Sequence, residues 1–213
     1  MHNYIVFDVE TGGLDYKVNP ITQIAMVVLD GTTLQELEAY STYIKPYDST
    51  HVYEPKALTY TGITMDMLNN KGEHHDTIFQ HLVTLFKKYK APGGRPGNSK
   101  YYPCLVGHNA SEFDRKFLWK FFKSHNCDLY DYVREYIEDT QLETQKAVPT
   151  LASVKLSNCC EHFGITLEGA HDALNDTRAT AQLFRVLCQK LRGEGVVQSS
   201  QEVAYSRSMK FQF

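Results

Sequence analysis

The sequence predicts an α/β fold built on a mixed β-sheet. Two observations lead to this prediction: apolar stretches rich in strand-forming residues dominate the N-terminal part, and segments with helical periodicity dominate the part from residue 75 onward. Short turns between the first stretches favour antiparallel neighbours, whereas strands separated by helices favour parallel ones. A chain of 213 residues is long enough to bury the core of one ordinary domain.

The N-terminal stretches are rich in valine, isoleucine and aromatic residues, which favour β-strands. The predicted strands are residues 4–9, 21–29 and 36–44. The Asp30-Gly31 pair between the second and third of them is typical of a tight turn, so we expect a meander. A short apolar stretch over residues 104–107 predicts a further strand.

Apolar residues that recur with a period of 3.6 predict the amphipathic helices. In residues 75–89 this face consists of Ile78, Leu82, Leu85, Phe86 and Tyr89. A stripe of aromatic and aliphatic residues from Phe113 to Phe122 predicts a helix whose apolar face is core. Two more helices are expected over 153–163 and 173–191, with short helical pieces over 55–70.

Two segments lack such periodicity. Residues 91–103 are rich in proline and glycine and are expected to form a surface loop. From Gly193 the sequence becomes polar and aperiodic. We therefore expect a domain of residues 1–192 that is followed by a C-terminal tail of residues 193–213.

The composition is typical of a soluble globular protein, with 42% hydrophobic and 22% charged residues. A net charge of −3 excludes a strongly basic chain, although a local basic surface remains compatible with it. Five cysteines form no CxxC pair, which favours reduced thiols. Because neither a signal peptide nor an apolar stretch of ~20 residues is recognisable, a cytoplasmic location is expected.

Two acidic residues at the end of the first predicted strand suggest a functional site. Asp8 and Glu10 are two residues apart, so their side chains share one face of the strand and their Cα atoms lie ~7 Å apart. Like charges at this separation repel each other, and burial strengthens the repulsion. Divalent cations such as Mg²⁺ prefer carboxylate oxygens, so this strand end is a predicted metal site.

Two later segments add acidic residues and a histidine. Asp114 falls in the first turn of a predicted helix, where the helix dipole favours any carboxylate, so by itself it is a weak signal. Asp172 suits an N-cap, and Asp176 falls one turn later on the inward face of the helix. A buried lone carboxylate is costly, so Asp176 needs a partner. His171 just before this helix is a candidate general base.

These residues form three motifs that resemble those of the DEDDh exonucleases, a family that includes the epsilon proofreading subunit of bacterial DNA polymerase III, ribonuclease T and oligoribonuclease. The motifs are Asp8-Val9-Glu10-Thr11, His108-Asn109 with Phe113-Asp114, and His171-Asp172-Ala173-Leu174-Asn175-Asp176. The sister DEDDy group has a tyrosine four residues before the last aspartate. Asp172 occupies that position here, which indicates the histidine class.

The resemblance implies a ribonuclease H-like fold, with a five-stranded mixed sheet flanked by helices. It also implies a 3′-5′ exonuclease that uses two Mg²⁺ or Mn²⁺ ions to release nucleoside 5′-monophosphates from single-stranded DNA, as in proofreading or end trimming. By resemblance, Asp8 bridges both ions, while Glu10 and Asp176 hold the ion on the nucleophile side. Asp114 supports the other ion through water, and His171 takes the proton of the attacking water.

The resemblance further implies contacts to the substrate. These residues are Thr11, Gly12, Leu14, Ile63, His108 and Asn109. Leu14 and Ile63 match apolar residues that wedge against terminal bases, although core packing explains Ile63 equally well. Asn109 has two interpretations, a phosphate contact or a cap of the following helix. Gly12 stands where the family commonly has threonine, so a hydroxyl contact is absent there.

The sequence leaves the substrate and the partners open. An exoribonuclease of the same chemistry is an alternative, because discrimination depends on the space around the 2′-hydroxyl group. A non-catalytic module that docks on a polymerase or nuclease complex through the tail is a second alternative, and the intact set of chemical residues argues against it. A purely structural acidic cluster is disfavoured, because inward acids without a cation destabilise a fold.

Overall fold

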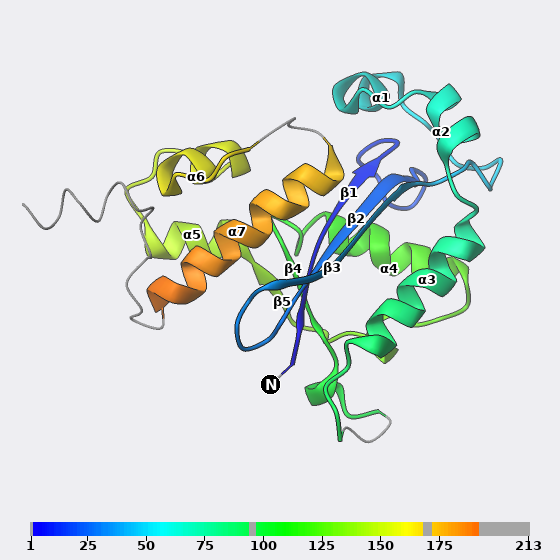
Figure 1. Ribbon diagram of the computed structural model, residues 1–213. Coiled ribbons are helices and arrows are strands. Elements are labelled where there is room, and N and C mark those ends of the chain that lie inside the picture. Colours follow the sequence, from blue (N-terminus) through cyan, green and yellow to red (C-terminus); the bar gives the residue numbers. More distant parts are fainter. Residues whose placement is uncertain (1, 94–96, 168–171, 192–213) are drawn as a thin grey trace, which may run out of the picture.

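The computed structural model describes residues 2–93, 97–167 and 172–191, and its centre is a five-stranded sheet (Figure 1). The strands are β1 (Tyr4–Thr11), β2 (Ile21–Leu29), β3 (Glu36–Tyr43), β4 (Cys104–Gly107) and β5 (Ile137–Asp139), in the order β3-β2-β1-β4-β5. The pairs β1–β2 and β2–β3 are antiparallel, whereas β1–β4 and β4–β5 are parallel. The mixed sheet with an N-terminal meander is therefore confirmed.

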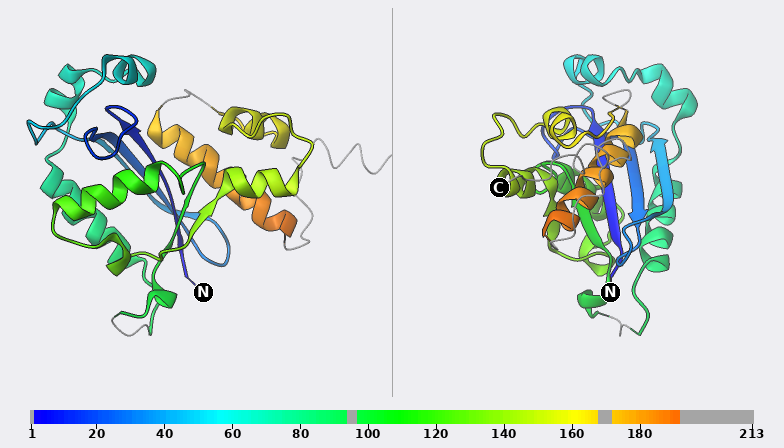
Figure 2. Two further views of the ribbon diagram at one scale, coloured as in Figure 1. Left: turned by 180° about the vertical axis from the view of Figure 1, so that it is seen from behind. Right: turned by 60° about the vertical axis from the view of Figure 1, so that its left-hand side comes forward.

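The helices surround this sheet on both faces. They are α1 (Pro55–Thr61), α2 (Met65–Lys71), α3 (His75–Lys88), α4 (Asp114–Ser124), α5 (Thr140–Ala147), α6 (Leu156–Phe163) and α7 (Ala173–Leu191). The helices α3 and α4 cover one face, and α7 lies against the other (Figure 2). The helix α6 packs beside α7, through Cys159 and Leu187 among others.

Alternation along β1 decides which residues meet which helix. Ile5 and Phe7 join the core formed with α3 and α4. Val6, which points the other way, packs with Phe184 of α7. Asp8 and Glu10 lie two and four residues after Val6, so they share its face of the sheet. Both acidic side chains therefore lie on the face that α7 covers.

The predicted elements agree with the structure except in two places. The helix expected over 153–163 begins only at Leu156, because the chain is still extended at Lys155. No element was predicted over residues 137–147, where β5 and α5 form. The strand β5 spans three residues, which is too short for periodicity to be recognised, and α5 is mostly polar.

Three sequence-based expectations concern the chain as a whole. All five cysteines are free thiols. Among the described residues, none of the helices combines the length and apolar character needed to cross a bilayer. The expected tail of residues 193–213 lies outside the described residues, so the division into a domain and a tail stays a prediction.

We predict that Leu118→Ala destabilises the fold by about 2–5 kcal/mol, because it leaves a cavity where α4 packs on the sheet. Leu118 is fully buried, at 0% exposure, in the core shared by α3, α4 and β1. Leu142→Ala is a matched control, since Leu142 in α5 is 47% exposed. Urea unfolding of both variants measures the difference, and equal losses of stability would contradict this account of the core.

Candidate active site

Two neighbouring carboxylates and a third that is remote in the sequence meet at the C-terminal end of β1. Asp8, Glu10 and Asp176 each offer one oxygen, and these oxygens all lie within 4.8 Å of one another. Asp8 and Glu10 come from one face of β1, and Asp176 comes from the first turn of the helix that packs on this face. An oxygen cluster of this size is suited to hold a divalent cation.

Asp114 is the fourth carboxylate of this site. It is the first residue of α4 and is 6% exposed. Its Oδ1 accepts a hydrogen bond of 3.3 Å from the backbone N–H of Val9, the residue between Asp8 and Glu10. The structure therefore brings together all four acidic residues that the sequence singled out.

The carboxyl groups raise one another's pKa. Burial raises the pKa of Asp8 well above its ordinary value, and the charges of Asp114, Glu10 and Asp176 raise it further. Burial and the charges of Asp176, Asp114 and Asp172 raise the pKa of Glu10 to about 7. Burial also raises the pKa of Asp114 to about 7, although the hydrogen bond from Val9 opposes this shift. A bound cation would offset the part of these shifts that comes from neighbouring charges.

Asp172 fixes the start of α7, as an N-cap does. Its Oδ1 accepts hydrogen bonds from the backbone N–H groups of Leu174 and Asn175, both at 3.1 Å. The predicted N-cap is thus confirmed, and it holds the turn of helix that carries Asp176. His171 lies outside the described residues, so its position relative to the carboxylates stays a prediction.

Asp139 is a residue of the site region that the sequence analysis missed. Its carboxylate accepts hydrogen bonds from the backbone N–H groups of Asn109, Ser111 and Gln141, at 2.9, 3.1 and 3.1 Å, and from the Ser111 hydroxyl. Burial opposes ionisation of Asp139, but these hydrogen bonds outweigh it and hold its pKa below the ordinary value. Asp139 thereby fixes the turn between β4 and α4, and with it the position of Asp114.

A sequence signal for Asp139 existed. It precedes α5 directly and caps it through Gln141, so an aspartate before a helix could have been recognised as an N-cap. Its bonds to the β4–α4 turn carry no local signal, because they join segments about thirty residues apart. Asn109 sits in that turn with φ of 62°, a left-handed conformation that asparagine adopts more readily than most residues.

The residues implied as substrate contacts lie in different surroundings. Leu14 is 81% exposed in the loop after β1. Ile63 is buried, at 3% exposure, as core packing would require. Thr11 is buried, and its hydroxyl donates to the carbonyl of Gly13 at 2.7 Å. The N–H of Gly12 donates to the carbonyl of Pro20 at 2.9 Å.

His108 and Asn109 begin the turn that leads into α4. The ring of His108 is held at both nitrogens: Nδ1 lies 2.9 Å from Oγ1 of Thr140, and Nε2 lies 2.8 Å from the carbonyl oxygen of Val154. The backbone N–H of Asn109 donates to the carboxylate of Asp139, and Asn109 is exposed to solvent. His108 therefore braces the turn in the structure as described, while Asn109 is accessible from solvent.

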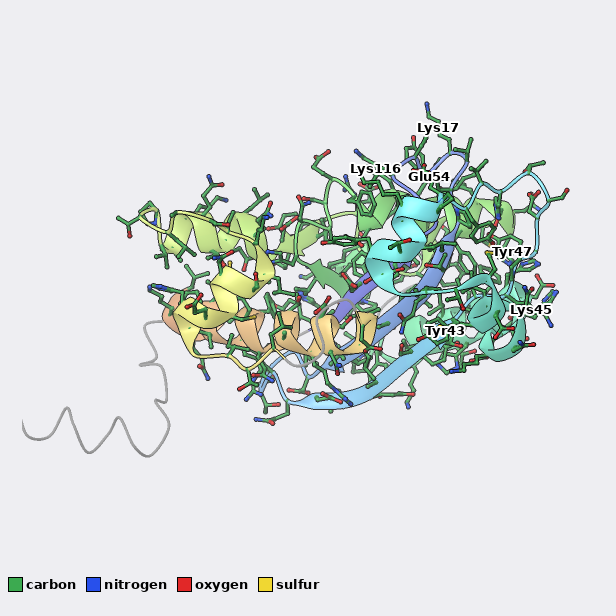
Figure 3. All side chains as sticks on the ribbon, turned by 90° about the horizontal axis from the view of Figure 1, so that it is seen from above. Lys17, Tyr43, Lys45, Tyr47, Glu54 and Lys116 are labelled. Carbon is green, nitrogen blue, oxygen red and sulfur yellow. The ribbon has the colours of Figure 1, made fainter. Side chains whose placement is uncertain are left out.

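A surface hollow lies beside Leu14. Its wall combines cationic and aromatic side chains, namely Lys17, Lys116, Phe113 and Phe117, together with Asp15, Tyr16 and Glu112. Figure 3 looks onto this end of the molecule and shows Lys17 and Lys116 near each other beside Glu54. Such a combination of side chains suits a single-stranded nucleic acid, because cations attract its phosphates and aromatic rings stack on its bases.

Comparisons with known proteins agree with this geometry. The family model of the RNase T exonucleases matches residues 5–91 and 99–184. The chain is 31% identical over 193 residues to a PolC-type DNA polymerase III of Clostridium perfringens, covering 90% of this chain and 12% of that protein. It is 29% identical over 209 residues to the 3′-5′ exonuclease DinG of Staphylococcus saprophyticus, covering 98% of this chain and 20% of that protein. The chain thus spans a small part of these relatives.

A solved structure shares the fold. Escherichia coli exonuclease I in complex with a dT13 oligonucleotide superposes with a TM-score of 0.73 at 22% identity, covering 91% of this chain and 43% of that chain. This likeness confirms the predicted ribonuclease H-like fold. Since the family model matches most of the chain and the acidic motifs converge as expected, the chain belongs to the RNase T exonuclease family.

Proposed function

We propose that this protein is a metal-dependent 3′-5′ exonuclease that hydrolyses phosphodiester bonds at the 3′ end of single-stranded DNA and releases nucleoside 5′-monophosphates. The observation that carries the proposal is the convergence of Asp8, Glu10 and Asp176 within 4.8 Å, with Asp114 bonded to the strand between them. Membership of the exonuclease family supports the reaction class. The oligonucleotide complexes of E. coli exonuclease I support single-stranded DNA as the substrate.

The donor atoms fit hard divalent cations, because all of them are carboxylate oxygens. We propose two Mg²⁺ or Mn²⁺ ions held by Asp8, Glu10 and Asp176, with Asp114 in support. When bound, such a pair acidifies a water molecule and neutralises charge on the reacting phosphate. A zinc-bound form of the complex of E. coli exonuclease I with single-stranded DNA supports a dependence on divalent cations.

His171 is the proposed general base. A histidine with an ordinary pKa of ~6.5 can accept the proton of an attacking water near neutral pH. Its place in the sequence, directly before the Asp172 cap of the helix that carries Asp176, supports this role.

The hollow beside Leu14 is the proposed binding site of the terminal nucleotides. Leu14 would pack against the last base, and Lys17 and Lys116 would approach the phosphate backbone (Figure 3). The other implied contacts would shape the pocket around the 3′ end; they are Thr11, Gly12, Ile63, His108 and Asn109. An exoribonuclease stays the alternative, because the 2′-hydroxyl group decides between DNA and RNA.

The biological setting is also a proposal. Several of the relatives are DNA polymerases of the PolC type, which supports a proofreading or end-trimming role beside a polymerase. The expected tail is the proposed contact to such a partner, and it lies outside the described residues.

We expect Asp8→Asn to lower the rate of nucleotide release by at least about 1,000-fold, because removing one charge of the cluster costs several kcal/mol of transition-state stabilisation. The assay digests 5′-labelled single-stranded DNA and RNA with Mg²⁺, Mn²⁺ or EDTA. Glu161→Gln is the control, since Glu161 is an exposed acid of α6 outside both the carboxylate site and the hollow. Metal-independent digestion, or equal rates for Asp8→Asn and the wild type, would refute the proposed site.

We expect His171→Ala to lose activity while it keeps metal binding, because the imidazole is proposed to move a proton and not to hold the ions. The Mg²⁺-induced rise in melting temperature measures binding independently of turnover. A variant with wild-type rates would remove His171 from the mechanism.

Stabilisation by Mg²⁺ should grow with pH. The pKa of both Glu10 and Asp114 is raised to about 7, so between pH ~4 and 7 the native state binds more protons than the unfolded chain. The metal-free cluster therefore lowers stability as pH rises through this window. Mg²⁺ binds the ionised form, so its stabilising effect should be larger at pH 8 than at pH 5.5. Melting curves with Mg²⁺ and with EDTA test this, and an equal shift at both pH values would contradict it.

A further inference from the structure

A second group of metal-ligating side chains lies where the N-terminus of α3 meets the C-terminus of α4 (Figure 1). His74 is the N-cap of α3, His75 and Asp76 are its first residues, and His125 is the C-cap of α4. We call these four residues the histidine cluster. None of them belongs to the three acidic motifs, and the proposed exonuclease mechanism does not use them.

The distances within the cluster match those of a tetrahedral metal site. Nδ1 of His75 lies 3.0 Å from Nε2 of His125, and each of these nitrogens lies 3.4 Å from Oδ1 of Asp76. In a tetrahedral zinc site with bonds of ~2.0–2.1 Å, the ligand atoms are separated by about 3.3 Å. The three atoms thus form a triangle of the size that three zinc ligands require.

His74 lies beside this triangle and is the candidate for a fourth ligand. His74, His75 and Asp76 each offer one atom, and these atoms lie within 4.8 Å of one another. Nδ1 of His74 is 3.5 Å from Oδ2 of Asp76. It also accepts a long hydrogen bond of 3.4 Å from the N–H of Asp76, which a bond to a metal would replace.

The two central imidazole rings are held in place by their neighbours. The ring of His125 stacks on Phe79 with centroids 4.3 Å apart and an interplanar angle of 3°, and its side chain is 8% exposed. The ring of His75 stacks on Tyr47 at 4.1 Å. These contacts aim both rings at the same point before any ligand arrives, so binding costs little side-chain entropy.

The second nitrogen of His125 has the partner that metal-ligating histidines usually have. Its Nδ1 lies 2.8 Å from the carbonyl oxygen of Phe121, to which only an N–H can donate. In this tautomer Nε2 carries a lone pair that faces His75 and Asp76.

We propose that the histidine cluster binds one Zn²⁺ ion, with His75, His125 and Asp76 as central ligands and His74 as the fourth. Imidazole nitrogen favours Zn²⁺, whereas Mg²⁺ prefers oxygen, so this site differs in chemistry from the carboxylates at the end of β1. The ion ties the first turn of α3 to the last residue of α4. It therefore stabilises the pair of helices that covers one face of the sheet and carries Asp114 at its other end.

The experiment is a calorimetric titration of the full chain with Zn²⁺ in excess Mg²⁺, so that the carboxylate site is already filled. We expect the wild type to bind one Zn²⁺ at the cluster, and His75→Gln and Asp76→Asn to bind it at least about 100-fold more weakly. Asp76 is 65% exposed, so Asp76→Asn should leave the fold intact, which circular dichroism checks. His162→Gln is the matched control, because His162 is an exposed histidine of α6 outside the cluster.

Co²⁺ provides a second measurement. In the cluster it should give the intense visible absorption of a four-coordinate ion without a thiolate band, and the absorption should disappear in both cluster variants. Zn²⁺ binding that is equal in the wild type and the cluster variants would place the ion elsewhere and overturn the proposal. Absence of Zn²⁺ uptake in excess Mg²⁺ would overturn it as well. Neither result bears on exonuclease activity, which the DNA digestion assay measures separately.

Discussion

Mutual repulsion among the acidic side chains at the end of β1 is the constraint around which this structure is organised. Burial and neighbouring charges raise the pKa of Asp8, Glu10 and Asp114, so the cluster stores unfavourable energy whenever it is ionised without a cation. Two helices moderate this cost, because Asp114 and Asp176 lie in the first turns of α4 and α7, where the helix dipole favours negative charge. A divalent cation would offset the repulsion that remains.

Hydrogen bonds fix the segments that carry the acidic residues. Asp172 caps α7 one turn before Asp176, and the N–H of Val9 anchors Asp114. Asp139 holds the turn before α4 through three hydrogen bonds. These contacts fix the segments that carry Asp114 and Asp176, which keeps the acids close together despite their repulsion.

The two ends of α4 lie beside two groups of side chains with different donor atoms. Its N-terminus brings Asp114 to a site made of carboxylate oxygens, and its C-terminus brings His125 to a cluster dominated by imidazole. Carboxylate oxygens favour hard cations such as Mg²⁺, whereas imidazole nitrogens favour borderline cations such as Zn²⁺. One helix therefore links the proposed reaction centre to a proposed structural ion, one at each of its ends.

Local patterns in the sequence were sufficient for the strands of the meander, for the long helices and for the four acids. Period-two alternation put Asp8 and Glu10 on one face of β1, and the 3.6-residue period put Asp176 on the inward side of α7. The resemblance of the three motifs then indicated the family, which the comparisons confirm.

Only the tertiary structure revealed β5, the support that Asp139 provides, and the meeting of His75 with His125. A strand of three residues has too little periodicity to be recognised, and hydrogen bonds between distant segments leave no local pattern. The sequence by itself determined which residues are candidates for the chemistry, because residue type and spacing are local properties. Which remote segments lie side by side was decided by packing, because it depends on the crossing of helices and strands over a shared core.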